Sequence, residues 1–159
     1  MGRSLASKNG NDKVFTPELL ASDIVRHFSP SGKLLEPCAG KMAFVKAMPG
    51  CAWYEIDLGK DFFDASGHWD WIITNPPYSI YRDFMKKCMF VADNIVFLQL
   101  INATFYKARL KDIYNSGFGI AEILFTDTPE TWPSFGFQVG VVHYKRGYCG
   151  HCKIGYMKP

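Results

Sequence analysis

The stretch that decides the fold is WDWIITNPPY at residues 69–78, an apolar strand that runs straight into a double-proline turn. Pro76 and Pro77 each fix a φ angle and lack a backbone N–H, so this turn is stiff. It presents two hydrogen-bond acceptors, the Asn75 side-chain oxygen and the Pro76 carbonyl, beside the Tyr78 ring. A bare Pro-Pro pair is most often a plain strand-ending turn. Two acceptors next to a flat ring, however, match a planar exocyclic amine with two N–H groups.

Strands and helices alternate on both sides of this stretch. Thr16 is expected to cap the first helix, with Pro17 at its first position. The alternation predicts an α/β fold in which a mostly parallel sheet has helices on both faces. No helix separates the last two strands, so we expect them to form an antiparallel pair at one edge. The pattern predicts strands at 33–36, 51–56, 69–74, 94–100, 120–125 and 137–145, and helices at 17–28, 43–48, 80–91 and 106–115.

Acidic residues follow successive strands of this predicted sheet. Glu36 ends the first strand and runs into the turn Pro37–Gly40, Glu55 ends the second, and Asp61-Phe62 comes shortly after it. Ligands of open parallel sheets bind beyond the carboxyl ends of the strands. Carboxylates there suit a cationic, hydroxyl-rich ligand: Glu36 could face an amino or sulfonium group, Glu55 a ribose, and Asp61 an adenine amino group.

Length and charge restrict the classes of protein that remain. A chain of 159 residues fits one domain. Its net charge of +3 is mildly basic, which is compatible with a polyanionic partner without requiring one. We expect a mobile tail at 1–13, one domain at 14–146 and a short C-terminal tail at 147–159. No apolar run approaches the roughly 20 residues that span a bilayer, so no membrane partner is expected.

The five cysteines are odd in number and scattered, which favours a reducing cytoplasm over a disulfide framework. The sequence CGHC at 149–152 supplies only part of a four-ligand zinc site. We therefore predict no metal.

Taken together, these motifs resemble the amino-methyltransferases of DNA, in particular the N6-adenine group whose cofactor motifs precede the catalytic one. The resemblance runs from residue 14 to about 146, and it implies a Rossmann-like seven-stranded methyltransferase sheet with S-adenosylmethionine as cofactor. The matching segments, in order, are Phe15-Thr16-Pro17, Glu36-Pro37-Cys38-Ala39-Gly40 with Phe44, Tyr54-Glu55-Ile56-Asp57, Asp61-Phe62-Phe63 and Asn75-Pro76-Pro77-Tyr78.

The resemblance also implies a role for each matching residue. Thr16 and its neighbours would contact the methionine end of the cofactor, with Glu36 and the turn after it beneath. Glu55 and Ile56 would hold the ribose, and Asp61 with Phe62 the adenine. The loop at 75–78 would be catalytic, in direct in-line transfer to an adenine flipped out of DNA.

The flipped base is expected to stack on Tyr78 and on an aromatic residue before the last strand. We select Phe135 for this second role over Trp132 and Phe137. Basic residues on the predicted helix at 106–115 are expected to contact the nucleic-acid backbone: Lys107, Arg109 and Lys111.

The chain departs from this family in two respects. Met42 stands in the stretch where a second glycine is usual. No target-recognition domain follows the core, so selectivity is expected from short loops, a partner subunit or a homodimer, or to be nearly absent. An RNA adenine methyltransferase, a protein glutamine methyltransferase and a non-catalytic cofactor-binding subunit remain alternatives. A bacterial, phage or mobile-element host would suit so small an enzyme.

Overall fold

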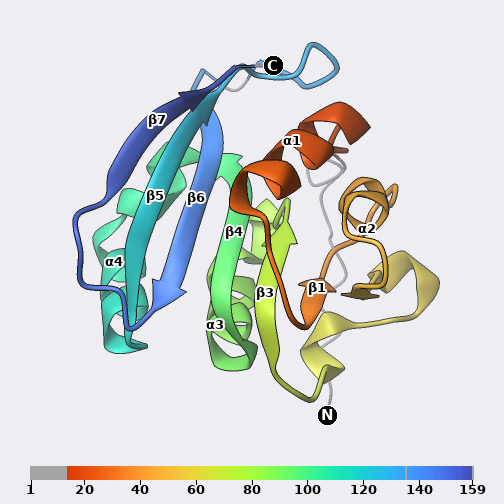
Figure 1. The fold of residues 1–159 in the computed structure, drawn as a ribbon, viewed down its shortest axis with the longest axis horizontal. Helices are drawn as coiled ribbons and strands as arrows, with labels where there is room; N and C mark the ends of the chain where they lie inside the picture. Colours follow the sequence, from red (N-terminus) through yellow and green to blue (C-terminus); the bar gives the residue numbers. More distant parts are fainter. Residues whose placement is uncertain (1–13, 135, 159) are drawn as a thin grey trace.

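The computed structural model describes residues 14–134 and 136–158, and it contains one seven-stranded sheet (Figure 1). The strands lie in the order β2-β1-β3-β4-β6-β5-β7. Their bounds are β1 Leu34–Glu36, β2 Ala52–Trp53, β3 Trp69–Thr74, β4 Ala92–Leu100, β5 Phe118–Thr126, β6 Val139–Arg146 and β7 Lys153–Met157. The α-helices are α1 Glu18–Phe28, α2 Ala43–Ala47, α3 Tyr81–Val91 and α4 Lys107–Asn115. Short 3-10 turns are η2 Ile56–Leu58, η3 Phe62–Asp64, η4 Tyr78–Ile80 and η5 Ile101–Phe105.

The sheet is mostly parallel, as the sequence predicts. Strands β2, β1, β3 and β4 run parallel, while β6 is antiparallel to both of its neighbours, β4 and β5. The predicted antiparallel pair β5–β6 is therefore present. It is not the outermost pair, because β7 lies beyond β5 and runs parallel to it.

The segment 147–159, expected as a tail, contributes this edge strand. Lys153–Met157 pairs with β5 from Glu122 to Thr126. A Cβ atom on Gly155 would lie 3.1 Å from the Leu124 side chain, so a bare backbone lets β7 pack close to β5. Met157 packs against the buried apolar cluster beneath α1. The segment is short and contains a glycine, so its sequence carries little strand signal.

Helices cover both faces of the sheet, as predicted. On one face α3 and α4 bury Phe84 and Ile113 against one apolar cluster, and on the other α1 and α2 bury Ile24 and Phe44 against a second (Figure 1). Strand β4 is buried on both sides, which explains its nearly continuous apolar sequence. The longest helices, α1 and α3, have 11 residues each. Across the described residues no helix is both long and apolar enough to cross a bilayer.

The start of α1 differs from the expected one. Glu18 is the first helical residue and Pro17 the N-cap, and no side chain caps the helix. The Thr16 hydroxyl instead lies 3.4 Å from Asn75 Nδ2, on the turn after β3. The residues before α1 are thus drawn toward the double-proline turn, 59 residues away in sequence.

Candidate active site

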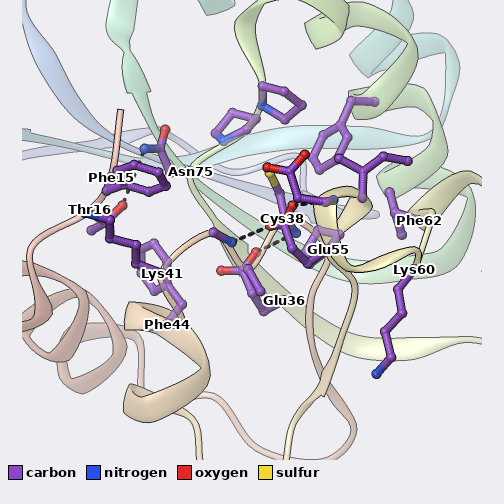
Figure 2. A pocket seen from close by; sticks show the side chains of 18 of the residues that line it. Phe15, Thr16, Glu36, Cys38, Lys41, Phe44, Glu55, Lys60, Phe62 and Asn75 are labelled. Atoms are coloured by element: carbon purple, nitrogen blue, oxygen red, sulfur yellow. Dashed lines mark hydrogen bonds between the residues drawn. The ribbon is translucent and has the colours of Figure 1, made fainter. Parts of the chain in front are cut away.

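A cavity of about 660 Å³ lies at the carboxyl ends of β1, β2 and β3. This volume is in the range of pockets that hold nucleotide-sized ligands. Figure 2 shows its side chains from close by, with Phe15, Thr16 and Asn75 on one side and Glu36 and Glu55 below. The lining residues come from the segment before α1, from the end of β1 and the turns after the three strands, and from α2 and α3: 14–16, 36–41, 43–44, 55–58, 60–63, 75–78, 80 and 84.

Glu36 is the most deeply buried charged side chain of this cavity, with 1% of its surface exposed. Its Oε1 accepts hydrogen bonds from the Cys38 N–H at 2.8 Å and from the Thr74 hydroxyl. Burial raises the pKa of Glu36 to about 8, and the nearby Glu55 charge adds to this increase, while the two hydrogen bonds oppose it. Glu36 can therefore change its charge near neutral pH, at the floor of the cavity.

Glu55 joins the turns that follow β1 and β2. Its Oε2 accepts from the Gly40 N–H at 2.6 Å and its Oε1 from the Asp57 N–H at 3.1 Å. Gly40 has φ 50°, in the left-handed region, and a Cβ atom there would lie 3.4 Å from the Phe15 ring. Since glycine adopts this conformation without strain, the β1 turn can approach both Glu55 and Phe15 closely.

Met42 also lies in the left-handed region, with φ 69°, at the N-cap of α2. It stands in the stretch where the motifs that this sequence resembles usually have a second glycine. The backbone therefore keeps a conformation that glycine favours, although a side chain is present.

Asp61 and Phe62 form the wall beyond β2. The Asp61 Oδ1 accepts from the Phe63 N–H at 2.9 Å and so caps η3. The Phe62 ring is 4% exposed, with its centroid 5.2 Å from that of Phe84 and 6.0 Å from that of Tyr54. Phe62 thus belongs to the core as well as to the cavity wall.

Asn75 occupies the turn after β3, with its amide oriented by the segment before α1. Its Nδ2 donates to the Val14 carbonyl at 2.9 Å. Because a carbonyl only accepts, this contact identifies which amide atom is nitrogen. Within residues 14–134 and 136–158, the buried Oδ1 has no hydrogen-bond partner. Pro76, Pro77 and Tyr78 follow it along the cavity lining.

Trp132 connects the loop before β6 to Phe15, which lines the cavity. Its Nε1 donates to the Phe15 carbonyl at 2.8 Å, and the residue is 6% exposed. Lys41 Nζ lies 4.5 Å from the centroid of the Phe15 ring. Trp132 is thus a buried residue that holds the segment before α1 in place. Phe137, in contrast, is 60% exposed. Phe135, selected for base stacking, lies outside the described residues.

Nearly all of the residues assigned to the cofactor from the sequence line this one cavity. They are Phe15, Thr16, Glu36, Pro37, Cys38, Ala39, Gly40, Glu55, Ile56, Asp61, Phe62 and Asn75. Pro17 is the exception, since it is the N-cap of α1. Lys107, Arg109 and Lys111 lie on α4, outside the lining.

Sequence reasoning gave no cavity role to Lys60, Ile80 or Phe84, which also line it. Lys60 Nζ lies 3.5 Å from the centroid of the Trp53 ring. No spacing signal marks these residues. Their positions depend on how η2 and α3 pack at the end of the sheet.

Searches of protein-family models and of curated protein sequences find no match to the chain. Solved structures do match. A Pyrococcus horikoshii protein with a proposed assignment as an RNA methyltransferase superposes with TM-score 0.62 and 16% identity, covering 81% of this chain and 82% of that one. The 23S rRNA methyltransferase ErmE matches with TM-score 0.60 and 12% identity, over 85% of this chain and 72% of ErmE.

The M protein of the type I restriction enzyme EcoKI matches with TM-score 0.64 and 14% identity. The match covers 84% of this chain but only 44% of the M protein. At such identities the likeness concerns the fold. The chain therefore has the Rossmann-like fold found in S-adenosylmethionine-dependent methyltransferases, including enzymes of RNA and a restriction-modification subunit.

Proposed function

We propose that the protein transfers a methyl group from S-adenosylmethionine to the N6 amino group of adenine in DNA. One observation carries the proposal: the buried Asn75 Oδ1 has no donor among the described residues, while the Nδ2 of the same amide is fixed on Val14. Buried polar atoms in native proteins nearly always have a partner. An amino group of the substrate would supply the missing donor.

The residues around the cavity fit the proposed cofactor. S-adenosylmethionine would supply a methyl group on a positively charged sulfur, together with a ribose and an adenine. Glu36 places a carboxyl group that can ionise at the cavity floor, suited to a cationic end. The Glu55 oxygens, which already accept backbone N–H groups, have further lone pairs for ribose hydroxyls. Asp61 with Phe62 would bind the adenine.

In the proposed mechanism the chain positions the amine and stabilises the positive charge that develops on it. Asn75 Oδ1 and the Pro76 carbonyl accept hydrogen bonds from the two N6 hydrogens, which localises the nitrogen lone pair and stabilises the growing positive charge. The N–C bond would form as the C–S bond of the sulfonium breaks to leave a neutral thioether, and the methylated nitrogen would then lose one proton to water. Tyr78 stacks on the flipped adenine. Lys107 and Lys111 would contact phosphates, and a partner subunit or a second copy could supply sequence recognition.

A substrate panel tests the proposal. The purified protein is given methyl-labelled S-adenosylmethionine with duplex DNA, with RNA of the same sequence, or with a glutamine-containing protein. We expect label in N6-methyladenine from DNA, identified by mass spectrometry of nucleosides, and only background from Asn75→Ala. Label in RNA or in glutamine would replace DNA adenine as the target. Cofactor binding without label in any substrate would indicate a non-catalytic subunit.

A further inference from the structure

An exposed aromatic segment follows β4, at the same end of the sheet as the double-proline turn. Strands β3 and β4 are parallel neighbours, with Thr74 opposite Phe97, so the chain leaves both strands on the same side. Asn75 begins the turn after β3, whereas η5 follows β4 and ends at Phe105. Phe105 is 51% exposed, and the next residue, Tyr106, is 58% exposed.

Tyr106 is the outer member of a three-layer stack. The Arg109 guanidinium carbon lies 4.9 Å from the centroid of the Tyr106 ring and 4.5 Å from that of the Tyr81 ring. Both distances are within the range of cation–π attraction. Arg109 also donates from a guanidinium nitrogen to the Ala103 carbonyl at 2.6 Å. Arg109, which the sequence predicts to contact the nucleic-acid backbone, therefore contacts two aromatic rings and a backbone carbonyl in this structure.

The inner member of the stack is anchored in the core, close to the catalytic turn. Tyr81 is 2% exposed and lies three residues after Tyr78. Its hydroxyl donates to Gln99 Oε1 at 2.7 Å and lies 3.3 Å from the Tyr144 hydroxyl. The Tyr106 ring is thus supported by a buried hydrogen-bonded group, and ordering it on binding costs little conformational entropy.

The surroundings of Tyr106 are basic. Lys107 and Lys111 are exposed on the same helix. The nearest acid along that helix, Asp112, is bound by Arg82 at 2.6 Å, so its charge is already compensated. Within the part of the chain that the structure describes, Lys107 and Lys111 form no ion pair. A flat aromatic face with such lysines beside it is the combination that proteins use to bind single-stranded nucleic acid.

We propose that Tyr106 is the stacking platform for an unpaired base next to the target nucleotide. A base inside a duplex has both faces covered by its neighbours, so only an unstacked base can occupy this ring. The preferred substrate is then DNA in which the bases flanking the target adenine are unpaired, such as a single strand or a bubble. This inference rests on the proposed function for the identity of the target.

Binding by fluorescence anisotropy tests the platform without requiring turnover. The same labelled adenine-containing sequence is presented as single-stranded DNA, as a bubble and as a full duplex, with single-stranded RNA as a further arm. We expect wild type to prefer the unpaired DNAs. Tyr106→Ala should raise their Kd by about 5- to 150-fold, the range for the loss of one base–aromatic stack. The duplex Kd should change less than about twofold, because a paired base does not use the ring.

Two variants serve as controls. Tyr106→Trp keeps a flat ring and should retain the preference for unpaired DNA. Tyr114→Ala removes a 61%-exposed aromatic residue near the far end of α4 and should leave every Kd unchanged. Equal binding of Tyr106→Ala and wild type to single strands would overturn the platform, as would an equal loss with Tyr114→Ala.

The outcomes also separate the platform from the proposed function. A Tyr106-dependent preference for RNA over DNA would support the platform and make RNA its ligand. Tyr106-dependent binding without methyl transfer would contradict the proposed function alone. N6-methylation of DNA with no Tyr106 effect on binding would contradict the platform alone.

Discussion

The two sides of the cavity use their polar groups differently. On the side of β1 and β2, the carboxylates of Glu36, Glu55 and Asp61 all accept backbone N–H groups of neighbouring turns. On the side of β3, Asn75 satisfies only its Nδ2 and leaves a buried oxygen without a donor in the described part of the chain. Each carboxylate on the first side therefore has a backbone hydrogen bond in the absence of a ligand. The second lacks a hydrogen bond that a ligand can supply, and an unmet buried acceptor costs about 1–3 kcal/mol.

The largest effect should come from removing that unmet acceptor. Asn75→Ala should lower kcat for methyl transfer by about 100- to 1000-fold, the usual loss when one group that stabilises transition-state charge is deleted. The Kd for S-adenosylmethionine should rise much less, and isothermal titration calorimetry measures it separately. Asn75→Gln retains the amide but moves it by one methylene, so it should lose nearly as much kcat. Undiminished turnover in either variant would remove Asn75 from the mechanism.

A smaller effect, on cofactor affinity instead of kcat, should come from a substitution on the side of β1 and β2. Glu55→Gln replaces one carboxylate oxygen with a donor, which cannot accept from Gly40 or Asp57. Hydrogen bonds to charged groups contribute about 1.5–3 kcal/mol, so the Kd for S-adenosylmethionine should rise roughly 10- to 100-fold. At saturating cofactor, kcat should stay near wild type. A loss confined to kcat would place Glu55 with the reacting atoms and erase the difference between the two sides.

The charge of Glu36 should make cofactor binding pH-dependent. Its pKa of about 8 lies above the unfolded value of 4.5. Between these values the folded, ligand-free protein holds a proton that the unfolded chain has released, so its stability falls as pH rises through this window. A cationic ligand end favours the ionised carboxylate, so affinity should increase with pH, by about tenfold from pH 7 to 9.

The matched variant for this test is Glu36→Gln, which cannot ionise. The ratio of wild-type to variant affinity removes the titration of the ligand itself. Calorimetry in buffers of different ionisation enthalpy should also detect proton release on binding to wild type at pH 7 and none at that position in the variant. A flat ratio across pH 7–9 would show that Glu36 does not face a cationic group.

The smallest effect concerns backbone strain beneath the cavity. Met42 has φ 69°, a conformation that costs a residue with a side chain about 1–2 kcal/mol. Met42→Gly relieves this strain but loses the half-buried side chain, whereas Met42→Ala loses the side chain and keeps the strain. Glycine should therefore exceed alanine in free energy of unfolding by about 1 kcal/mol, measured by urea denaturation. Equal stability of the two variants would mean that the left-handed turn stores no strain.

The predictable parts of this protein are those governed by local pattern. Apolar runs bounded by turn residues located β3 and β4, and the carboxyl-end rule then brought Glu36, Glu55 and Asn75 to one cavity. That inference needs only strand direction, because neighbouring parallel strands end at the same edge.

The parts that could not be predicted depend on contacts between distant segments. Strand β7 exists because Lys153–Met157 meets β5, which is about 30 residues earlier in the chain. The Thr16 hydroxyl lies near Asn75 instead of capping the helix. The Arg109 guanidinium, which the sequence predicts to contact the nucleic-acid backbone, lies against the rings of Tyr81 and Tyr106. In each case the observed partner comes from a distant segment or from the packing of α4, and the sequence around the residue does not reveal it.

The bond from Trp132 to the Phe15 carbonyl has a consequence for how the protein is made. Its two ends are 117 residues apart, so Phe15 leaves the ribosome long before the tryptophan that secures it. At about 5–20 residues per second, several seconds pass between the synthesis of Phe15 and that of Trp132, and during this time the hydrogen bond between them cannot form. A chain that has not yet reached residue 132 therefore lacks the donor that holds the Phe15 carbonyl beside the cavity.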